Sequence, residues 1–217
     1  MYNIQSIICY NGGSGGDFVK ALCCKQYSKE KHINFAFSDQ GQTKFVSHYF
    51  KMYCEQNYRY WQQSQVPSTL DVGKVYPVEN SHYFHEWFKT ITPNIYFIDY
   101  PDHAAEQLVN IYLQKPHRGD IQKFLQNQKP TLPDWAQRKL DDKNFIKIFP
   151  ILWTKQIKVW RQRSDMTAIN LVDFFDVKKL QLIVEKITNV PVRDQEDFST
   201  FFEKWSSANQ ALREAVL

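Results

Sequence analysis

Four of the seven glycines in this 217-residue chain lie between Gly12 and Gly16. Glycine accepts backbone conformations with positive φ and allows close approach to the main chain, so such a cluster marks a special backbone requirement. The preceding residues 3–10 are mostly apolar and rich in isoleucine, which predicts a buried strand. After the cluster, apolar residues recur at helical spacing, and Asp17 stands where a helix N-terminus favours an acid. We therefore expect a strand, a glycine turn and a helix in succession.

The rest of the chain alternates strand and helix patterns. Further strands are predicted at residues 32–37, 94–100 and 167–172, because each run is short, β-rich and bounded by turn residues. Helices are predicted at residues 43–63, 102–113, 152–163, 178–188 and 196–216, and residues 116–150 predict short helices and connections. This alternation indicates one α/β domain over residues 1–217, with a parallel sheet covered by helices on both faces.

Composition excludes several classes of protein. No run of about 18 apolar residues is present, which argues against a membrane-spanning helix. The N-terminus lacks the pattern of a secretory signal, so we expect a cytoplasmic protein. The cysteines lack C-x-x-C spacing and are expected to be buried free thiols; they are Cys9, Cys23, Cys24 and Cys54.

The formal net charge of +4 is concentrated in one segment. Residues 137–163 hold eight Lys or Arg against two Asp, a net of +6, whereas a nucleic-acid binder usually has a broad basic surface. Within this segment Lys158, Arg161 and Arg163 lie largely off the apolar stripe of the predicted helix. They could neutralise a small anionic ligand, and a solvated helix face is the alternative.

The glycine cluster is the main candidate for ligand binding, because ligands of α/β sheets usually bind beyond the carboxyl ends of the strands. Its backbone amides could hold a phosphate at the positive end of the helix, or the glycines could only permit a tight turn. The candidate residues are Gly12, Gly13, Ser14, Gly15 and Gly16. Asp17 and Phe18 follow where a Walker A loop has lysine and a hydroxyl residue, which argues against an ordinary ATPase. Lys20 could add positive charge to the loop or lie on a solvated helix face.

The loop resembles that of the sulfotransferase-like branch of P-loop proteins, especially divergent phage and marine microbial members whose first strand ends in Gly-Gly-Ser-Gly-Gly-x-Phe. Residues 94–113 (NIYFIDYPDHAAEQLVNIYL) look like the family's second diagnostic strand and helix. Residues 167–190 look like its late strand and helix, and residues 198–212 (FSTFFEKWSSANQAL) like its C-terminal Trp-bearing helix. The resemblance implies a three-layer P-loop-type fold. It also implies 3′-phosphoadenosine-5′-phosphosulfate (PAPS) as donor, with its phosphosulfate on the glycine loop and its sulfuryl group passed to a hydroxyl of a sugar or small molecule.

Sulfuryl transfer needs a base for the acceptor hydroxyl. The family often places a histidine just before its second diagnostic strand, and His82 and His85 stand there. The alternative is a pair of histidines without a catalytic role in an aromatic-rich helix. No third ligand with suitable spacing accompanies them, so no metal site is predicted.

Two positions depart from the family pattern. Asp99 stands where the family has an arginine and Gln107 where it has a serine, and both family residues hold the donor's 3′-phosphate. These departures motivate a second hypothesis, a binding or virion-associated protein that keeps the fold without catalysis. A nucleotide or phosphate kinase is a third hypothesis, although it would need the missing loop lysine. The sequence does not determine the oligomeric state.

Overall fold

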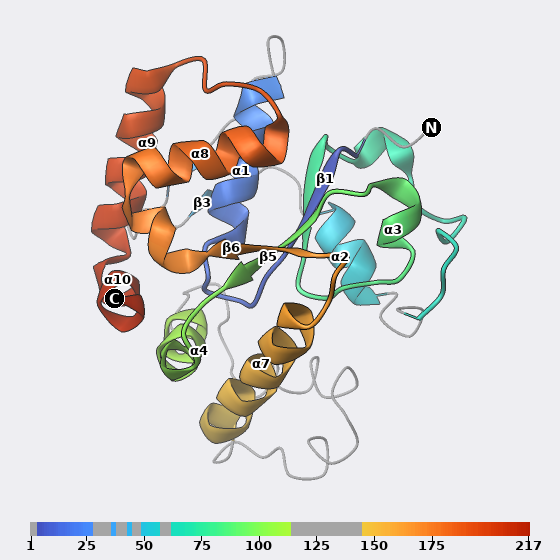
Figure 1. Cartoon of the computed structure of the whole chain (residues 1–217), viewed down its shortest axis with the longest axis horizontal. Coiled ribbons are helices and arrows are strands. Elements are labelled where there is room, and N and C mark those ends of the chain that lie inside the picture. The colour runs from blue at the N-terminus through green and yellow to red at the C-terminus, as the bar shows by residue number, and fades with distance from the viewer. Residues whose placement is uncertain (1–3, 28–35, 38–42, 45–48, 57–61, 114–144) are drawn as a thin grey trace.

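The parallel sheet is the centre of the computed structural model, which describes residues 4–27, 36–37, 43–44, 49–56, 62–113 and 145–217. Its strands are β1 (Ser6–Cys9), β4 (Val78–Ser81), β5 (Ile95–Asp99) and β6 (Thr167–Asn170). They lie in the order β4-β1-β5-β6, so β1 has β4 on one side and β5 on the other (Figure 1). After β1 the chain forms β4 on one side of it and then crosses to form β5 on the other side. The carboxyl edge of the sheet at such a change in strand order is the usual place for a ligand.

Helices cover both faces of this sheet. α1 (Gly16–Tyr27) packs beside α8 (Val177–Thr188), and the Tyr96 hydroxyl donates to the Lys186 carbonyl oxygen of α8 at 3.2 Å. The neighbouring residue, Phe97, has its ring 6.0 Å from that of Trp160 in α7 (Phe145–Arg161). Because successive strand residues face opposite sides of a sheet, α8 and α7 cover opposite faces. The predicted α/β class with a parallel sheet is confirmed.

Shorter elements complete the described chain. α2 (Tyr49–Gln56) packs against β4, and α4 (Ala105–Leu113) packs against α7. The remaining helices are α3 (Phe88–Ile91), α9 (Gln195–Ala208) and α10 (Gln210–Val216). Single 3-10 turns are η2 (Val72–Lys74), η3 (Asp102–Ala104) and η6 (Leu171–Phe175). β2 (Ala36–Phe37) and β3 (Thr43–Lys44) form a separate antiparallel pair.

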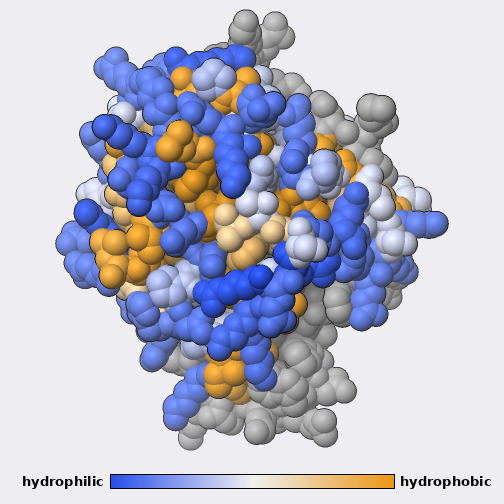
Figure 2. Space-filling model, in the orientation of Figure 1, coloured by the Kyte–Doolittle hydropathy of each residue, from blue (hydrophilic) through white to orange (hydrophobic). Residues whose placement is uncertain are grey.

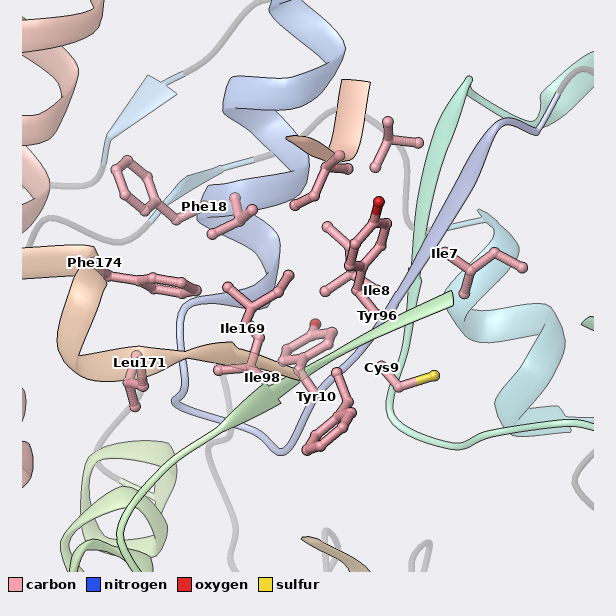
Figure 3. Packing of buried hydrophobic residues seen from close by; sticks show 14 of the residues in the cluster. Ile7, Ile8, Cys9, Tyr10, Phe18, Tyr96, Ile98, Ile169, Leu171 and Phe174 are labelled. Atoms are coloured by element: carbon pink, nitrogen blue, oxygen red, sulfur yellow. The ribbon is translucent and has the colours of Figure 1, made fainter. Parts of the chain in front are cut away.

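In the core on the α1 side of the sheet, residues near the start of the chain pack against residues near its end. Phe18 of α1 stacks on Trp205 of α9, with ring centroids 4.4 Å apart and planes 2° from parallel. Figure 3 shows Phe18 and Phe174 beside the side chains of the sheet, among them Ile8 and Ile169. The apolar stripe predicted for α7 is also buried, and it consists of Trp153, Ile157 and Trp160.

Several predicted elements differ from the structure. β4 is absent from the sequence prediction. Residues 43–63 were expected to form one helix, but residues 43–44 form β3 and the helix α2 covers only 49–56 of the described residues. The C-terminal helix is divided into α9 and α10 at Asn209. Of the expected strand 32–37, only 36–37 is described, and residues 116–144 of the segment 116–150 lie outside the described residues.

All four cysteines are buried and free, as predicted. Burial raises the pKa of each thiol, for Cys24 to about 12. In the part of the chain that the structure describes, no helix has both the length and the apolarity needed to cross a bilayer. Polar residues cover most of the coloured surface in Figure 2, and its apolar areas are separate from one another.

Candidate functional site

The glycine loop connects the carboxyl end of β1 to the first turn of α1. Gly13 has φ of 87° and Gly15 has φ of 78°, whereas Ser14 between them has a negative φ. A side chain at Gly15 would lie 3.1 Å from Cζ2 of Trp205 and would be strained by the positive φ. A side chain at Gly16 would overlap the ring of Tyr10. These positions therefore require glycine for two separate reasons, backbone conformation and close packing.

The loop is held together from inside. The Asn11 carbonyl oxygen accepts hydrogen bonds from the Ser14 amide at 3.2 Å and from the Ser14 hydroxyl at 2.7 Å. Ser14 is fully buried, so its hydroxyl stabilises the loop rather than facing a ligand. Across the described residues, no hydrogen bond uses the backbone amides of Gly12, Gly13 or Gly15. Backbone of alternating handedness is the conformation found in anion-binding nests. In this loop the amides of Gly12, Gly13 and Gly15 are the candidate donors, because the Ser14 amide donates to Asn11.

The described contacts of the Asp17 carboxylate do not conflict with anion binding by the glycine loop. Its carboxylate accepts hydrogen bonds from the Tyr10 hydroxyl at 2.9 Å, from Lys51 Nζ at 3.1 Å and from Asn80 Nδ2 at 2.8 Å. Lys51 lies in α2, Asn80 lies in β4, and Tyr10 directly follows β1, so all three partners lie outside the run from Gly12 to Gly16. The acid at the helix start is thus partly neutralised by Lys51.

Lys20 was a candidate for contact with a bound phosphate, and the structure places it elsewhere. It is 1% exposed and forms a buried ion pair with Glu79 of β4. Its Nζ also lies 5.3 Å from the centroid of the Tyr76 ring. Glu79 accepts a further hydrogen bond from the Tyr76 amide at 2.8 Å, and burial is the main cause that raises the pKa of this carboxyl. Lys20 therefore serves the packing of α1 against β4.

The two candidate histidines lie in the loop after β4, not in a helix, and their surroundings differ. His85 is fully buried, and among the described residues neither of its ring nitrogens has a hydrogen-bond partner. Burial lowers its pKa to about 4. Its ring packs 5.2 Å from that of Phe88. His82 keeps 17% of its side chain exposed at the carboxyl edge. Its Nδ1 lies 3.1 Å from the Tyr10 carbonyl oxygen, and its Nε2 lies 3.7 Å from Oε1 of Glu55. Of the two, only His82 is placed to meet a ligand.

The three basic candidates of the α7 region are all paired with carboxylates. Lys158 Nζ lies 3.2 Å from Asp102, and Arg161 binds both Asp99 and Asp102. Arg163 binds Asp165 at 2.7 Å and Glu86 at 3.0 Å, and its guanidinium lies over the ring of Phe84. These ion pairs neutralise the three positive charges that the sequence analysis proposed for binding an anionic ligand. The surroundings of Asp99 do not suit a 3′-phosphate, because the Asp99 carboxylate is negative and the neighbouring cation, Arg161, is already paired with it.

Comparisons of the chain with models of protein families, with curated proteins and with solved structures found no match. The site is therefore interpreted from its own chemistry. The described residues contain no group of three or more His, Cys, Asp or Glu side chains that could hold a metal ion.

Sequence reasoning missed the residues that support the loop. Asn11 donates from Nδ2 to the Tyr100 hydroxyl at 2.6 Å, and it is only 2% exposed. Asn80 and Lys51 anchor Asp17 from elements separated by more than 20 residues in the chain. The adjacency of Asn11 to the glycines was a possible signal for the first of these contacts. No comparable signal pointed to Lys51, because its partner depends on how α2 packs against β4.

Proposed function

We propose that this protein binds the sulfate or phosphate end of an anionic ester on the glycine loop, within a sulfotransferase-like fold of the three-layer P-loop type. The observation that carries the proposal is the alternation of Gly13 and Gly15 at positive φ around Ser14, directly before the N-terminus of α1. Their amides and the positive end of a 12-residue helix provide neutral donors for an anion. A phosphosulfate group fits this donor set, whereas the side of the site at Asp99 does not fit the 3′-phosphate of PAPS.

The test is isothermal titration with adenosine 5′-phosphosulfate, which lacks the 3′-phosphate, and with adenosine 3′,5′-bisphosphate and PAPS, with inorganic sulfate as competitor. We expect saturable heat that sulfate reduces. Gly13→Ala forces a side chain onto a residue with φ of 87° and should weaken binding at least about tenfold, because the strain distorts the donor set. Gly73→Ala, at an exposed glycine of η2, is the matched control and should bind as the wild type does. Absence of both heat and thermal shift at millimolar ligand would contradict the proposal.

Sulfuryl transfer is the second candidate function, and the position of His82 favours it. With Nδ1 directed at the Tyr10 carbonyl, Nε2 is the nitrogen that would take the proton of an acceptor hydroxyl. The new bond would join the acceptor oxygen to sulfur as the bond from sulfur to the donor phosphate breaks. The paired cations Lys158 and Arg161 favour the other alternative, ligand binding without catalysis.

A transfer assay with labelled PAPS and a panel of sugars and small alcohols separates the two alternatives. If transfer occurs with His82 as base, His82→Gln should lower the rate by a factor on the order of 100 or more. His85→Phe should retain the activity, because His85 is buried. Binding without any transfer would assign the non-catalytic function. The kinase hypothesis gains no support from the loop, because Lys20 is held by Glu79.

A further inference from the structure

α7 contacts three of the loops that follow the sheet strands. The Trp153 carbonyl oxygen lies 3.4 Å from Asn11 Nδ2 in the loop after β1. Gln156 Nε2 donates to the His82 carbonyl oxygen at 2.9 Å in the loop after β4. At its last residue, Arg161 Nη2 donates to the Tyr100 carbonyl oxygen at 2.7 Å after β5. One helix therefore holds the carboxyl ends of three neighbouring strands (Figure 1).

Arg161 makes the most extensive of these contacts. Its Nε lies 3.0 and 3.2 Å from the two carboxylate oxygens of Asp99, and its Nη1 lies 2.9 Å from Asp102. Together with the bond to the Tyr100 carbonyl, the rigid guanidinium fixes the main chain from Asp99 to Asp102. Lys158, one turn earlier, has the Asp102 carboxylate as its one ion-pair partner among the described residues, at 3.2 Å. The two cations share a partner but differ in their hold on the backbone.

Hydrogen bonds at both ends of Tyr100 and of Asn11 link this point to the glycine loop. The Tyr100 hydroxyl accepts from Asn11 Nδ2 at 2.6 Å, and both residues are 2% exposed. The Asn11 carbonyl then accepts from the amide and the hydroxyl of Ser14. Ser14 stands between the two positive-φ glycines. The hydrogen bond from Arg161 to the Tyr100 carbonyl is partly buried, and those from Asn11 to Tyr100 and from the Ser14 hydroxyl to Asn11 are buried. The covalent frames of Tyr100 and Asn11 join these bonds.

We propose that Arg161 is a positioning residue for the glycine loop and acts on it through Tyr100 and Asn11. Its charge is matched by Asp99 and Asp102, so its effect on the loop is geometric and not an attraction for the ligand. The consequence for anion affinity rests on the proposed function, whereas the positioning of Ser14 does not. The sequence made Arg161 a candidate for ligand contact. In the proposed role it supports the glycine loop without contacting the ligand.

The test compares Tyr100→Phe, Arg161→Gln and the control Lys158→Gln. Tyr100→Phe removes one hydroxyl without changing charge, and the two other variants each remove one positive charge beside Asp102. The reporter is exchange of the Ser14 amide hydrogen in the free protein, followed by NMR. Loss of one net hydrogen bond should speed this exchange about three- to tenfold in Tyr100→Phe and Arg161→Gln. Lys158→Gln should leave the exchange rate unchanged. The double variant Tyr100→Phe, Arg161→Gln should exchange the Ser14 amide hydrogen little faster than either single variant.

Titration with adenosine 3′,5′-bisphosphate supplies the second readout, with the dissociation constant expected to rise by a similar factor in the same two variants. Equal effects of Arg161→Gln and Lys158→Gln would overturn the proposal in favour of a charge effect. Unchanged Ser14 exchange in Arg161→Gln would overturn it as well. If the exchange pattern is as expected but the wild type binds no bisphosphate, the positioning role stands and the proposed function fails.

Discussion

The buried region around β4 and the carboxyl edge beside α7 both pair basic residues with acids, but under different conditions. Lys20 and Glu79 are almost wholly excluded from solvent, whereas Lys158 and Asp102 keep about half of their side chains exposed. A buried charge that loses its partner cannot be solvated, but an exposed one can. The comparison teaches that, among the described residues, Lys20 and Lys158 are each matched by an acid. The proposed anion binding therefore relies on backbone amides and not on either of these two cations.

The largest expected effect tests the buried region. Lys20→Met should lower the free energy of unfolding by about 3 to 5 kcal/mol, because it leaves Glu79 buried without its cation. Urea unfolding measures the change. The double variant Lys20→Met, Glu79→Leu is the control and should recover much of the loss. A loss below about 1 kcal/mol in the single variant would mean that the interior solvates Glu79 and would break the comparison.

The next effect lies at the glycine loop, between the two regions. Gly16→Ala should lower the free energy of unfolding by about 2 to 3 kcal/mol, because the new methyl group overlaps the Tyr10 ring in a packed interior. Thermal and urea unfolding measure it against Gly73→Ala. Similar stability of the two variants would show that Tyr10 moves aside at little cost.

A pH effect sharpens the contrast between buried and exposed polar groups. Burial lowers the pKa of His85 to about 4 from an ordinary value of 6.5, so below pH 6.5 the unfolded chain takes up a proton that the folded chain does not. Stability should therefore fall as the pH drops from 6.5 toward 4, by up to about 1.4 kcal/mol per pH unit from this residue. His85→Phe should reduce that slope, measured by urea unfolding between pH 7 and pH 5. The exposed control His103→Gln should keep the wild-type slope, and an unaltered slope in His85→Phe would contradict the prediction.

The smallest effect is expected at the carboxyl edge. Lys158→Gln should change the free energy of unfolding by less than about 1 kcal/mol, because its pair with Asp102 is exposed and screened by salt. Urea unfolding at low and high salt measures this change. A loss comparable to that of Lys20→Met would remove the distinction between the two regions.

Sequence patterns predicted well those elements in which the buried positions are apolar. β5 and α8 follow this rule, and their observed bounds lie within one residue of the predicted ones. β4 does not, because its buried residues include Glu79, Asn80 and Ser81. Polar residues of this kind predict a solvated loop, and their burial is possible only because Lys20 and other partners come from distant elements.

The sequence by itself determined the strand, the glycine loop and the helix that follows it, because glycine tolerance and apolar spacing are local properties. It also identified Gly12 to Gly16 as the place of a backbone requirement. Only the tertiary structure decided which charges are available there. Lys20, Arg161 and His85 were all candidate site residues in the sequence, but their burial and partners are set by long-range packing. Charge availability depends on neighbours, and neighbours far apart in the chain have no local pattern that predicts them.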